Sequence, residues 1–206
     1  MLAAIVASRA WSYLLFHSLA ELFSIIIAAS YFLVAWHTRK YNQVPSLVTL
    51  GFDASASIRE QAEILREAAA GKAVRLEIPA PGEVMVAADR DMLDTVLRNL
   101  LQNAVKFSPA GACVSVRTER NGAVWQISVD DTGIGMDADD LSKLFKVDGH
   151  LHRIGTNGER GVGFGLILSM EFIRLMYGRL DVTSVPGKGS SFRLSLPADD
   201  RRRLVR

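Results

Sequence analysis

Hydrophobic and polar positions follow two different patterns along the chain. Residues 11–36 are mostly apolar. As a helix rising about 1.5 Å per residue this run would be roughly 39 Å long, enough to cross a hydrocarbon core of about 30 Å with tilt. Residues 52–197 show shorter helical and alternating patterns, typical of a soluble α/β domain. The predicted parts are a membrane-spanning helix in residues 1–40, a linker in 41–52, a globular domain in 53–197 and a basic tail in 198–206.

The residues that flank the apolar run indicate its orientation. Arg39 and Lys40 follow it at once, whereas only Arg9 precedes it, so the positive-inside rule places its C-terminal side in the cytoplasm. A cleaved signal peptide fits poorly because the run is longer than the apolar core of an ordinary signal peptide and no small-x-small cleavage site directly precedes Arg39. A buried helix of a soluble protein is the other alternative. His17 and Glu21 could share one helix face, either as functional groups or as a pair near the membrane surface.

The globular domain alternates between helical and strand patterns. Ser57 and Glu60 have the spacing of a capping box, which predicts a helix that ends at Gly71. Asp91 can cap the next helix. Strand pairs dominate, which predicts a two-layer α/β sandwich: a mixed, mostly antiparallel sheet covered on one face by helices. The predicted helices are 57–71, 91–107 and 166–177, and the predicted strand pairs are 74–78 with 84–86 as a hairpin, 113–117 with 124–129, and 180–184 with 191–196.

The second predicted helix has two chemically different faces. Asn99, Asn103 and Lys106 share a narrow arc opposite the centre of the apolar face. Two amides and an ammonium are thus presented together, either as an ordinary solvated face or as part of a site. The apolar arc contains Leu93, Val96, Leu97, Leu100, Leu101 and Ala104.

Two glycine-rich blocks flank a segment without a convincing core pattern. Asp131-Thr132-Gly133-Ile134-Gly135 follows an alternating strand, and Gly161-Val162-Gly163-Phe164-Gly165-Leu166 leads directly into the last helix. Glycines let backbone N–H groups approach phosphate closely, and the N-terminal end of a helix favours negative charge. A single Gly-x-Gly turn is weak evidence, but the two blocks in this order, together with the polar arc upstream, predict a nucleotide pocket.

The composition excludes some classes of function but does not indicate a particular reaction. Hydrophobic residues are 49% and charged residues 22%, as in ordinary folded proteins. The net charge of +2 is too small to indicate nucleic-acid binding. Cys113 is the only cysteine, so no intrachain disulfide can form, and nothing points to an oxidising compartment.

These blocks together resemble the ATP-binding catalytic domain of sensor histidine kinases, in the superfamily shared with gyrase, Hsp90 and MutL. The resemblance covers about residues 53–197 and implies an α/β sandwich that binds ATP with Mg²⁺. Phe16 to Phe23 itself looks like part of the first helix of a multi-span bacterial membrane sensor region. Residues 99–107 look like the N box, 131–136 like the G1 box, 161–166 like the G2 box and 187–192 like the terminal strand motif, and Leu144-Phe145 sits where the family has its F box.

The resemblance implies roles for individual residues. Asp131 would accept a hydrogen bond from the adenine amino group, Asn103 would be a ligand of Mg²⁺, and Lys106 would contact phosphate oxygens. Residues 137–160 would form a lid over ATP. Further nucleotide contacts would come from Gly133, Gly135, Met136, Gly161, Val162, Gly163, Phe164, Gly165, Leu166 and Ser190.

Asn99 bears on the type of reaction. ATP-hydrolysing relatives have a glutamate at this position, four residues before the metal-binding asparagine, that activates water as a general base. An amide cannot accept that proton. Asn99 therefore favours phosphoryl transfer over hydrolysis, and with Asn103 and Lys106 it completes the predicted catalytic set.

The acceptor of the phosphoryl group is not evident in this chain. A complete sensor kinase has a dimerisation domain with a phosphoacceptor histidine, and none of His17, His37, His150 and His152 lies in such a motif. We therefore expect the dimerisation domain of another chain as the direct partner and a response regulator as the indirect one. The expected location is the bacterial inner membrane, with the ATP-binding domain in the cytoplasm. The alternatives are an ATP-binding regulatory remnant without kinase activity, and a serine kinase resembling the anti-sigma-factor kinases.

Overall fold

The computed structural model describes residues 51–78, 82–146, 155–159 and 164–200. The chain divides into two units, Met1–Val48 and Thr49–Arg206, and all the described residues belong to the second. Within the described ranges no helix has the length and apolar character needed to cross a membrane. The predicted membrane-spanning helix, with His17 and Glu21, lies outside the described residues.

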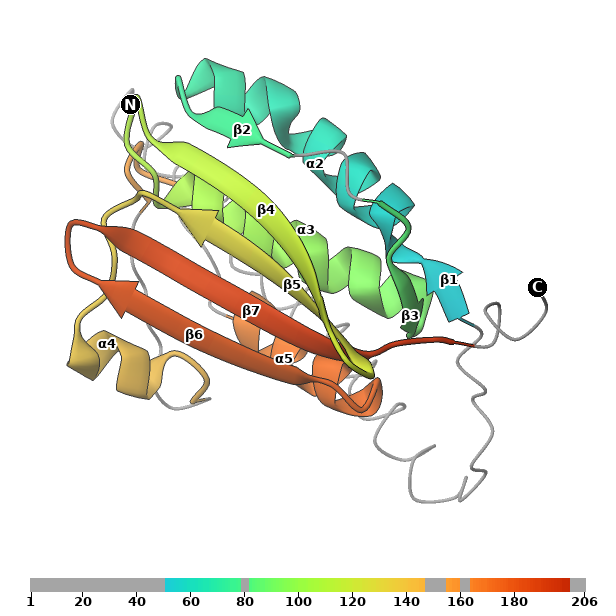
Figure 1. Ribbon diagram of the computed structural model, residues 1–206. Helices are drawn as coiled ribbons and strands as arrows, with labels where there is room; N and C mark the ends of the chain where they lie inside the picture. Colours follow the sequence, from blue (N-terminus) through green and yellow to red (C-terminus); the bar gives the residue numbers. More distant parts are fainter. Residues whose placement is uncertain (1–50, 79–81, 147–154, 160–163, 201–206) are drawn as a thin grey trace, which may run out of the picture. The chain divides into compact units, whose positions relative to one another are not determined.

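The described residues contain a five-stranded sheet, whose strands are β2 (Arg75–Glu77), β4 (Cys113–Asn121), β5 (Val124–Asp131), β6 (Arg179–Val185) and β7 (Gly189–Pro197). Their order is β2-β4-β5-β7-β6 (Figure 1). β2 runs parallel to β4, and the other neighbours are antiparallel. Alternate side chains of β4, β5 and β7 are buried on one face of the sheet. The predicted mixed, mostly antiparallel sheet is confirmed.

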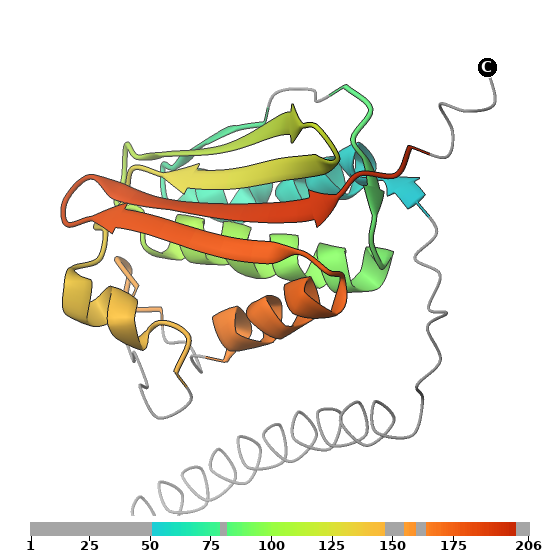
Figure 2. The same ribbon diagram turned by 60° about the horizontal axis from the view of Figure 1, so that its bottom comes forward.

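Three long helices, α2 (Ala54–Gly71), α3 (Arg90–Lys106) and α5 (Gly165–Leu175), lie on one face of the sheet in the described part of the chain (Figure 2). α3 packs against both α2 and α5 and against β5. Its apolar arc is buried as predicted, and Leu93, Leu97, Leu100 and Leu101 are fully inaccessible to solvent. A short helix, α4 (Ala138–Lys143), follows β5. The domain is therefore the expected two-layer α/β sandwich.

The starts of the first two described helices differ from the prediction. α2 begins at Ala54 and is capped by Asp53, whose carboxylate accepts from the N–H of Ser55 at 2.9 Å. Ser57, the predicted cap, is buried inside the helix. α3 is capped by Asp89 through the N–H of Met92, and Asp91 lies in its first turn. In both cases the cap is an aspartate at the end of the preceding extended segment, where its side chain can reach the free N–H groups of the first turn. The predicted cap lies too far along the chain to reach them.

The predicted hairpin of residues 74–78 and 84–86 is wrong. β2 pairs with β4, whereas β3 (Met85–Ala87) pairs antiparallel with β1 (Gly51–Asp53) in a separate two-stranded sheet. Asp53 explains this arrangement, because its Oδ1 also accepts from the N–H of Val84 at 2.9 Å. The cap of α2 thus holds β3 beside the chain that enters α2. The last two residues of the predicted linker consequently belong to β1.

The start of the predicted basic tail is also bound to the domain. The Ala198 N–H donates to Ala123 O, and the Asp199 N–H donates to Met85 O. Asp200 forms an ion pair with Arg120 at 2.6 Å. A free tail therefore does not begin at residue 198, and residues 201–206 lie outside the described ranges.

The end of α2 has an unusual left-handed residue. Gly71, the predicted stop signal, is still helical, and the residue with positive φ is Ala73 at 54°. The Val74 N–H donates to Ala69 O and the Ala73 N–H to Ala70 O, which together form a Schellman motif. Glycine is the usual residue at this position because a Cβ is strained there.

We predict that Ala73→Gly stabilises the domain and that Ala68→Gly, the same change at an exposed right-handed position of α2, destabilises it. Each change should alter the free energy of unfolding by about 0.5–1 kcal/mol, in opposite directions. Thermal unfolding of the full chain in detergent measures both shifts. Destabilisation by both variants would contradict the assigned conformation of Ala73.

Candidate nucleotide-binding site

One residue of the polar stripe of α3, Asn99, contacts the start of α5. Asn99, Asn103 and Lys106 are all half-buried. The Asn99 amide donates to Gly165 O at 3.2 Å and to Ser169 Oγ at 3.3 Å. Ser169 is fully buried, and its hydroxyl donates to Gly165 O at 2.8 Å. Asn99 is therefore part of a junction between two helices rather than of a solvated face.

Asp131 ends β5 as a buried carboxylate. Its Oδ1 accepts from the N–H groups of Gly133 at 2.8 Å and Ser190 at 3.2 Å, and Ser190 lies directly opposite it on β7. Among the described residues, its Oδ2 has no hydrogen-bond partner. One oxygen thus holds the turn after β5, and the other remains for a ligand donor.

The surroundings of Asp131 change its titration. Burial raises the pKa of this carboxyl, the two backbone N–H groups lower it, and nearby Asp130 raises it further, so that the net pKa lies above the ordinary value. Because the pKa is higher in the fold than in the unfolded chain, ionisation of Asp131 destabilises the folded state at pH values above that pKa. A perturbed carboxyl of this kind is typical of a functional position.

The glycines after Asp131 are needed for close backbone contacts. A Cβ at Gly133 would lie 2.4 Å from Phe107 O, at the end of α3, and the neighbouring Ile134 N–H donates to the same oxygen at 3.1 Å. Gly135 has φ of 66°, and a Cβ there would lie 2.0 Å from Val185 O. The G1-like block therefore packs directly on α3.

A serine that the sequence analysis did not select supports this block. Ser184 of β6 accepts at its Oγ from the Met136 N–H at 2.8 Å and hydrogen-bonds to Ser190 Oγ at 3.0 Å. It connects the buried Met136 to the terminal strand motif. Ser184 looked like an ordinary alternating strand residue, and no sequence signal marked it.

Residues 155–159, which lie within the predicted lid, contact the last turn of α3. The Thr156 N–H donates to Lys106 O at 3.1 Å, and its hydroxyl donates to Ser108 O at 2.8 Å. A Cβ at Gly155 would lie 2.7 Å from Lys106 Cγ. The Lys106 ammonium lies 5.0 Å from the centroid of the Phe107 ring. Segments that follow β5 and precede α5 therefore meet at the C-terminal end of α3.

Part of the predicted site lies outside the described residues. These residues are Gly161, Val162 and Gly163 of the G2-like block. Phe164 and Gly165 are described, and α5 begins at Gly165 without a side-chain cap on its first N–H groups. A helix start of this kind suits an anion.

Metal ligands are sparse in the described part of the chain, which contains no group of three or more histidine, cysteine, aspartate or glutamate side chains that could hold an ion. Asn103 can offer one neutral oxygen. Mg²⁺ in nucleotide sites commonly takes most of its ligands from phosphates and water, so this donor set fits an ion that arrives with a nucleotide.

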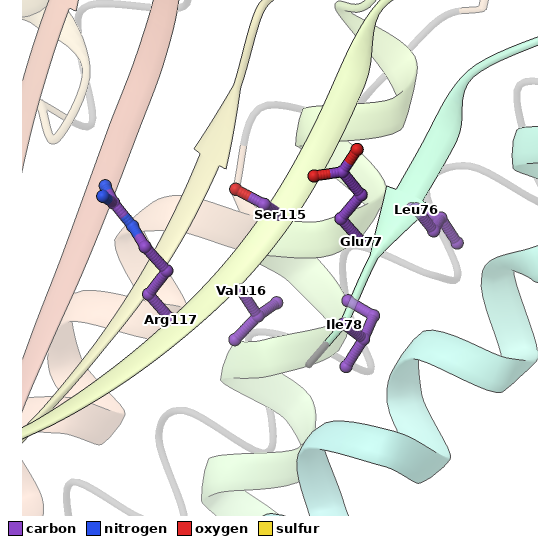
Figure 3. A pocket seen from close by; sticks show the side chains of 6 residues that line it. All are labelled: Leu76, Glu77, Ile78, Ser115, Val116 and Arg117. Carbon is purple, nitrogen blue, oxygen red and sulfur yellow. The ribbon is translucent and has the colours of Figure 1, made fainter. Parts of the chain in front are cut away.

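A surface hollow between β2 and β4 is separate from this site (Figure 3). Its lining residues are Leu76, Glu77, Ile78, Ser115, Val116 and Arg117. None of them belongs to the predicted nucleotide site. Arg117, one of these residues, pairs with Asp130 on β5 at 2.9 Å.

Comparison with known families decides the assignment of the domain. A family model described as histidine kinase-, DNA gyrase B-, and HSP90-like ATPase matches residues 88–200. The chain belongs to this family. The predicted ATP-binding domain is thereby confirmed, and a second model, of a membrane-associated sensor domain, matches residues 8–56. This second match agrees with the resemblance seen at Phe16 to Phe23 and indicates association with a membrane.

Relatives within this ATPase family include sensor kinases. SenX3 of Mycobacterium tuberculosis, a sensor-like histidine kinase, is 34% identical over 125 residues, which are 61% of this chain and 30% of that protein. SasA of Synechococcus elongatus, an adaptive-response sensory kinase, is 34% identical over 142 residues, or 68% of this chain and 36% of that protein. The chain thus spans about a third of the length of these relatives.

Solved structures share the fold of this ATPase domain. The catalytic domain of the histidine kinase ThkA matches with a TM-score of 0.60 and 22% identity, covering 72% of this chain and 94% of that domain. ShkA, solved in complex with AMPPNP, matches with a TM-score of 0.61 and 24% identity, covering 72% of this chain and 30% of that protein.

We predict that Gly133→Ala destabilises the domain by about 1–3 kcal/mol, because the new methyl group must displace the backbone at the end of α3. The matched control is Gly71→Ala, where a Cβ meets nothing within 4 Å and a small gain is expected. Thermal unfolding of the two variants compares the effects. An equal stability of Gly133→Ala and the unaltered chain would show that the turn after β5 does not pack on α3 as described.

Proposed function

We propose that this chain is the membrane-attached ATP-binding subunit of a two-component sensor histidine kinase, and that it transfers the γ-phosphoryl group of ATP to a histidine of another chain. The observation that carries the proposal is that three parts of the predicted site meet at α3. The polar stripe with Asn103, the turn of Asp131 and the start of α5 all adjoin this one helix.

The adenine end of the site would lie at Asp131. Oδ1 is held by two backbone N–H groups, which leaves Oδ2 as an acceptor for the exocyclic amino group. Because desolvation strengthens charged hydrogen bonds, a buried carboxylate is a selective acceptor for such a donor. Gly133, Gly135, Met136 and Ser190 would shape the wall around the base.

The phosphate end would lie between α3 and α5. Lys106 supplies a compact positive charge, and the uncapped N–H groups at Gly165 and Leu166 supply further donors. Gly161, Val162, Gly163 and Phe164 would complete this cradle. Asn103 would give one ligand to a Mg²⁺ ion, which would supply charge neutralisation at the phosphates when bound.

Transfer rather than hydrolysis follows from Asn99. In transfer, a nitrogen of the acceptor imidazole forms a bond to the γ-phosphorus while the bond to the bridging oxygen of ADP breaks. An imidazole nitrogen carries its own lone pair, so no general base for water is needed. The Asn99 amide cannot act as such a base, and its N–H groups are already donated to α5.

An apolar strip on α5 suits docking of the acceptor chain. Leu168 and Leu175 are 39% and 40% exposed, and their spacing of two turns places them on one helix face. Phe164, four residues before Leu168, is 43% exposed on the same face. A helical dimerisation domain would cover this strip. The residues before 49 would then hold the subunit at the inner membrane, with the ATP-binding domain in the cytoplasm.

We predict that Asp131→Asn weakens ATP binding by about tenfold to a hundredfold. The variant keeps an oxygen for the two backbone N–H groups but places an amide donor against the adenine amino group, which costs about 1.5–3 kcal/mol, and about 1.4 kcal/mol corresponds to tenfold. Asp130→Asn, which faces Arg117 on the other side of the sheet, is the control. Titration calorimetry on the full chain measures both, and near-native affinity for Asp131→Asn would sink the adenine assignment.

We predict that the full chain, incubated with γ-labelled ATP, labels a separate dimerisation domain that carries a phosphoacceptor histidine. The same domain with that histidine replaced by glutamine should stay unlabelled, and the label should be lost in acid, because a phosphoramidate is acid-labile. ATP binding without transfer would contradict the kinase proposal and favour a regulatory role. Acid-stable label on serine would indicate a serine kinase.

A further inference from the structure

Lys72, at the C-cap of α2, makes an unusual set of contacts. Its ammonium donates to Val105 O at 3.0 Å, Lys106 O at 2.8 Å, Thr156 Oγ1 at 2.8 Å and Glu159 Oε1 at 2.7 Å. The side chain is only 11% exposed. Three N–H groups thus serve four acceptors, which come from the end of α3 and from residues 155–159.

The electrostatics explain why a lysine suits this position. The last carbonyls of α3 carry the partial negative charge of a helix C-terminus, which favours a cation beside them. Glu159 supplies the full opposite charge that a mostly buried ammonium requires. Burial raises the pKa of Glu159, but hydrogen bonds from Lys72 and from the Asn157 N–H outweigh it, and the net pKa lies below the ordinary value.

The contacts of Lys72 surround a residue of the nucleotide site. Lys106 O accepts from both Lys72 and the Thr156 N–H. Gly155 packs so closely on the stem of Lys106 that a Cβ there would be 2.7 Å from Cγ and 2.3 Å from Glu159 Oε2. Residues 155–159 therefore limit where the stem of Lys106 can lie, and Lys72 holds these residues in place.

We propose that Lys72 is a positioning residue of the nucleotide site: it links residues 155–159 to the C-terminal end of α3 and thereby orients Lys106 towards the phosphates. The inference rests on the proposed function of Lys106 as a phosphate ligand. Lys72 itself acts through Lys106 and does not touch the nucleotide.

The test compares ligands with and without phosphates. Full-chain variants Lys72→Met, Lys72→Arg, Glu159→Gln and the double variant Lys72→Met/Glu159→Gln are titrated with ATP and with adenosine, by displacement of a fluorescent nucleotide. Lys72→Met should weaken ATP by roughly tenfold, the effect of one lost charge-assisted hydrogen bond, and leave adenosine unchanged. Lys72→Arg should restore part of the affinity. The double variant should be no weaker than Lys72→Met, because both single changes break the same link.

Controls separate a positioning role from a general loss of structure. Arg66→Met breaks an exposed ion pair with Glu63 in α2, away from every residue assigned to the nucleotide site, and should leave both ligands unaffected. If Lys72→Met does not fold, the comparison of ATP with adenosine is made with Glu159→Gln. This variant leaves Lys72 bonded to the carbonyls of α3. An equal loss for ATP and adenosine, or no loss for either, would overturn the proposal.

Hydrogen exchange without nucleotide distinguishes failure of this inference from failure of the proposed function. Lys72→Met should speed exchange of the Thr156 amide, which is bonded to Lys106 O, and Arg66→Met should not. Faster exchange in a chain that binds no ATP would establish the link but contradict both the proposed function and the role of Lys106. Unchanged exchange would contradict the link itself.

Discussion

The carbonyl groups at the C-terminal end of α3 are the constraint on which the site depends. Any helix leaves its last carbonyls without partners inside the helix, and buried carbonyls must be paired elsewhere. Here Val105 O and Lys106 O accept from Lys72, Lys106 O also accepts from Thr156, and Phe107 O accepts from Ile134. The donors come from three separate segments of the chain. Satisfying one helix end therefore brings together the segments of the proposed nucleotide pocket.

The rigidity of that helix end comes from the opposite face of α3. Four leucines of this face are fully buried between α2, α5 and the sheet, and burial of each such side chain contributes about 1.5–3 kcal/mol. This apolar contribution offsets the free-energy cost of polar groups that the fold holds in unfavourable surroundings. Asp131 is one of them, because its raised pKa shows that its ionised form is disfavoured by the fold.

Sequence patterns predicted the parts of the fold that depend on local periodicity. The buried arc of α3, the β4–β5 and β6–β7 pairs and the polar stripe of Asn99, Asn103 and Lys106 are examples. The pairing of β2 with β4 was missed because parallel partners are distant in sequence, and the true caps were missed because Asp53 and Asp89 end extended segments. Lys72 and Ser184 gave no signal, since their roles depend on tertiary contacts to backbone atoms.

At the junction between α3 and α5, Asn99 has a structural role in addition to lacking a general base. The Asn99 amide group donates to Gly165 O and to Ser169 Oγ, and Ser169 itself donates to Gly165 O. A glutamate carboxylate at position 99 would set a negative oxygen near a backbone carbonyl that needs donors, in a place where Ser169 is fully buried. A side chain able to activate water would therefore disrupt the contact that holds the start of α5 beside the polar stripe. In this chain, the packing of the proposed phosphate-binding helix and the proposed preference for transfer over hydrolysis depend on the same amide.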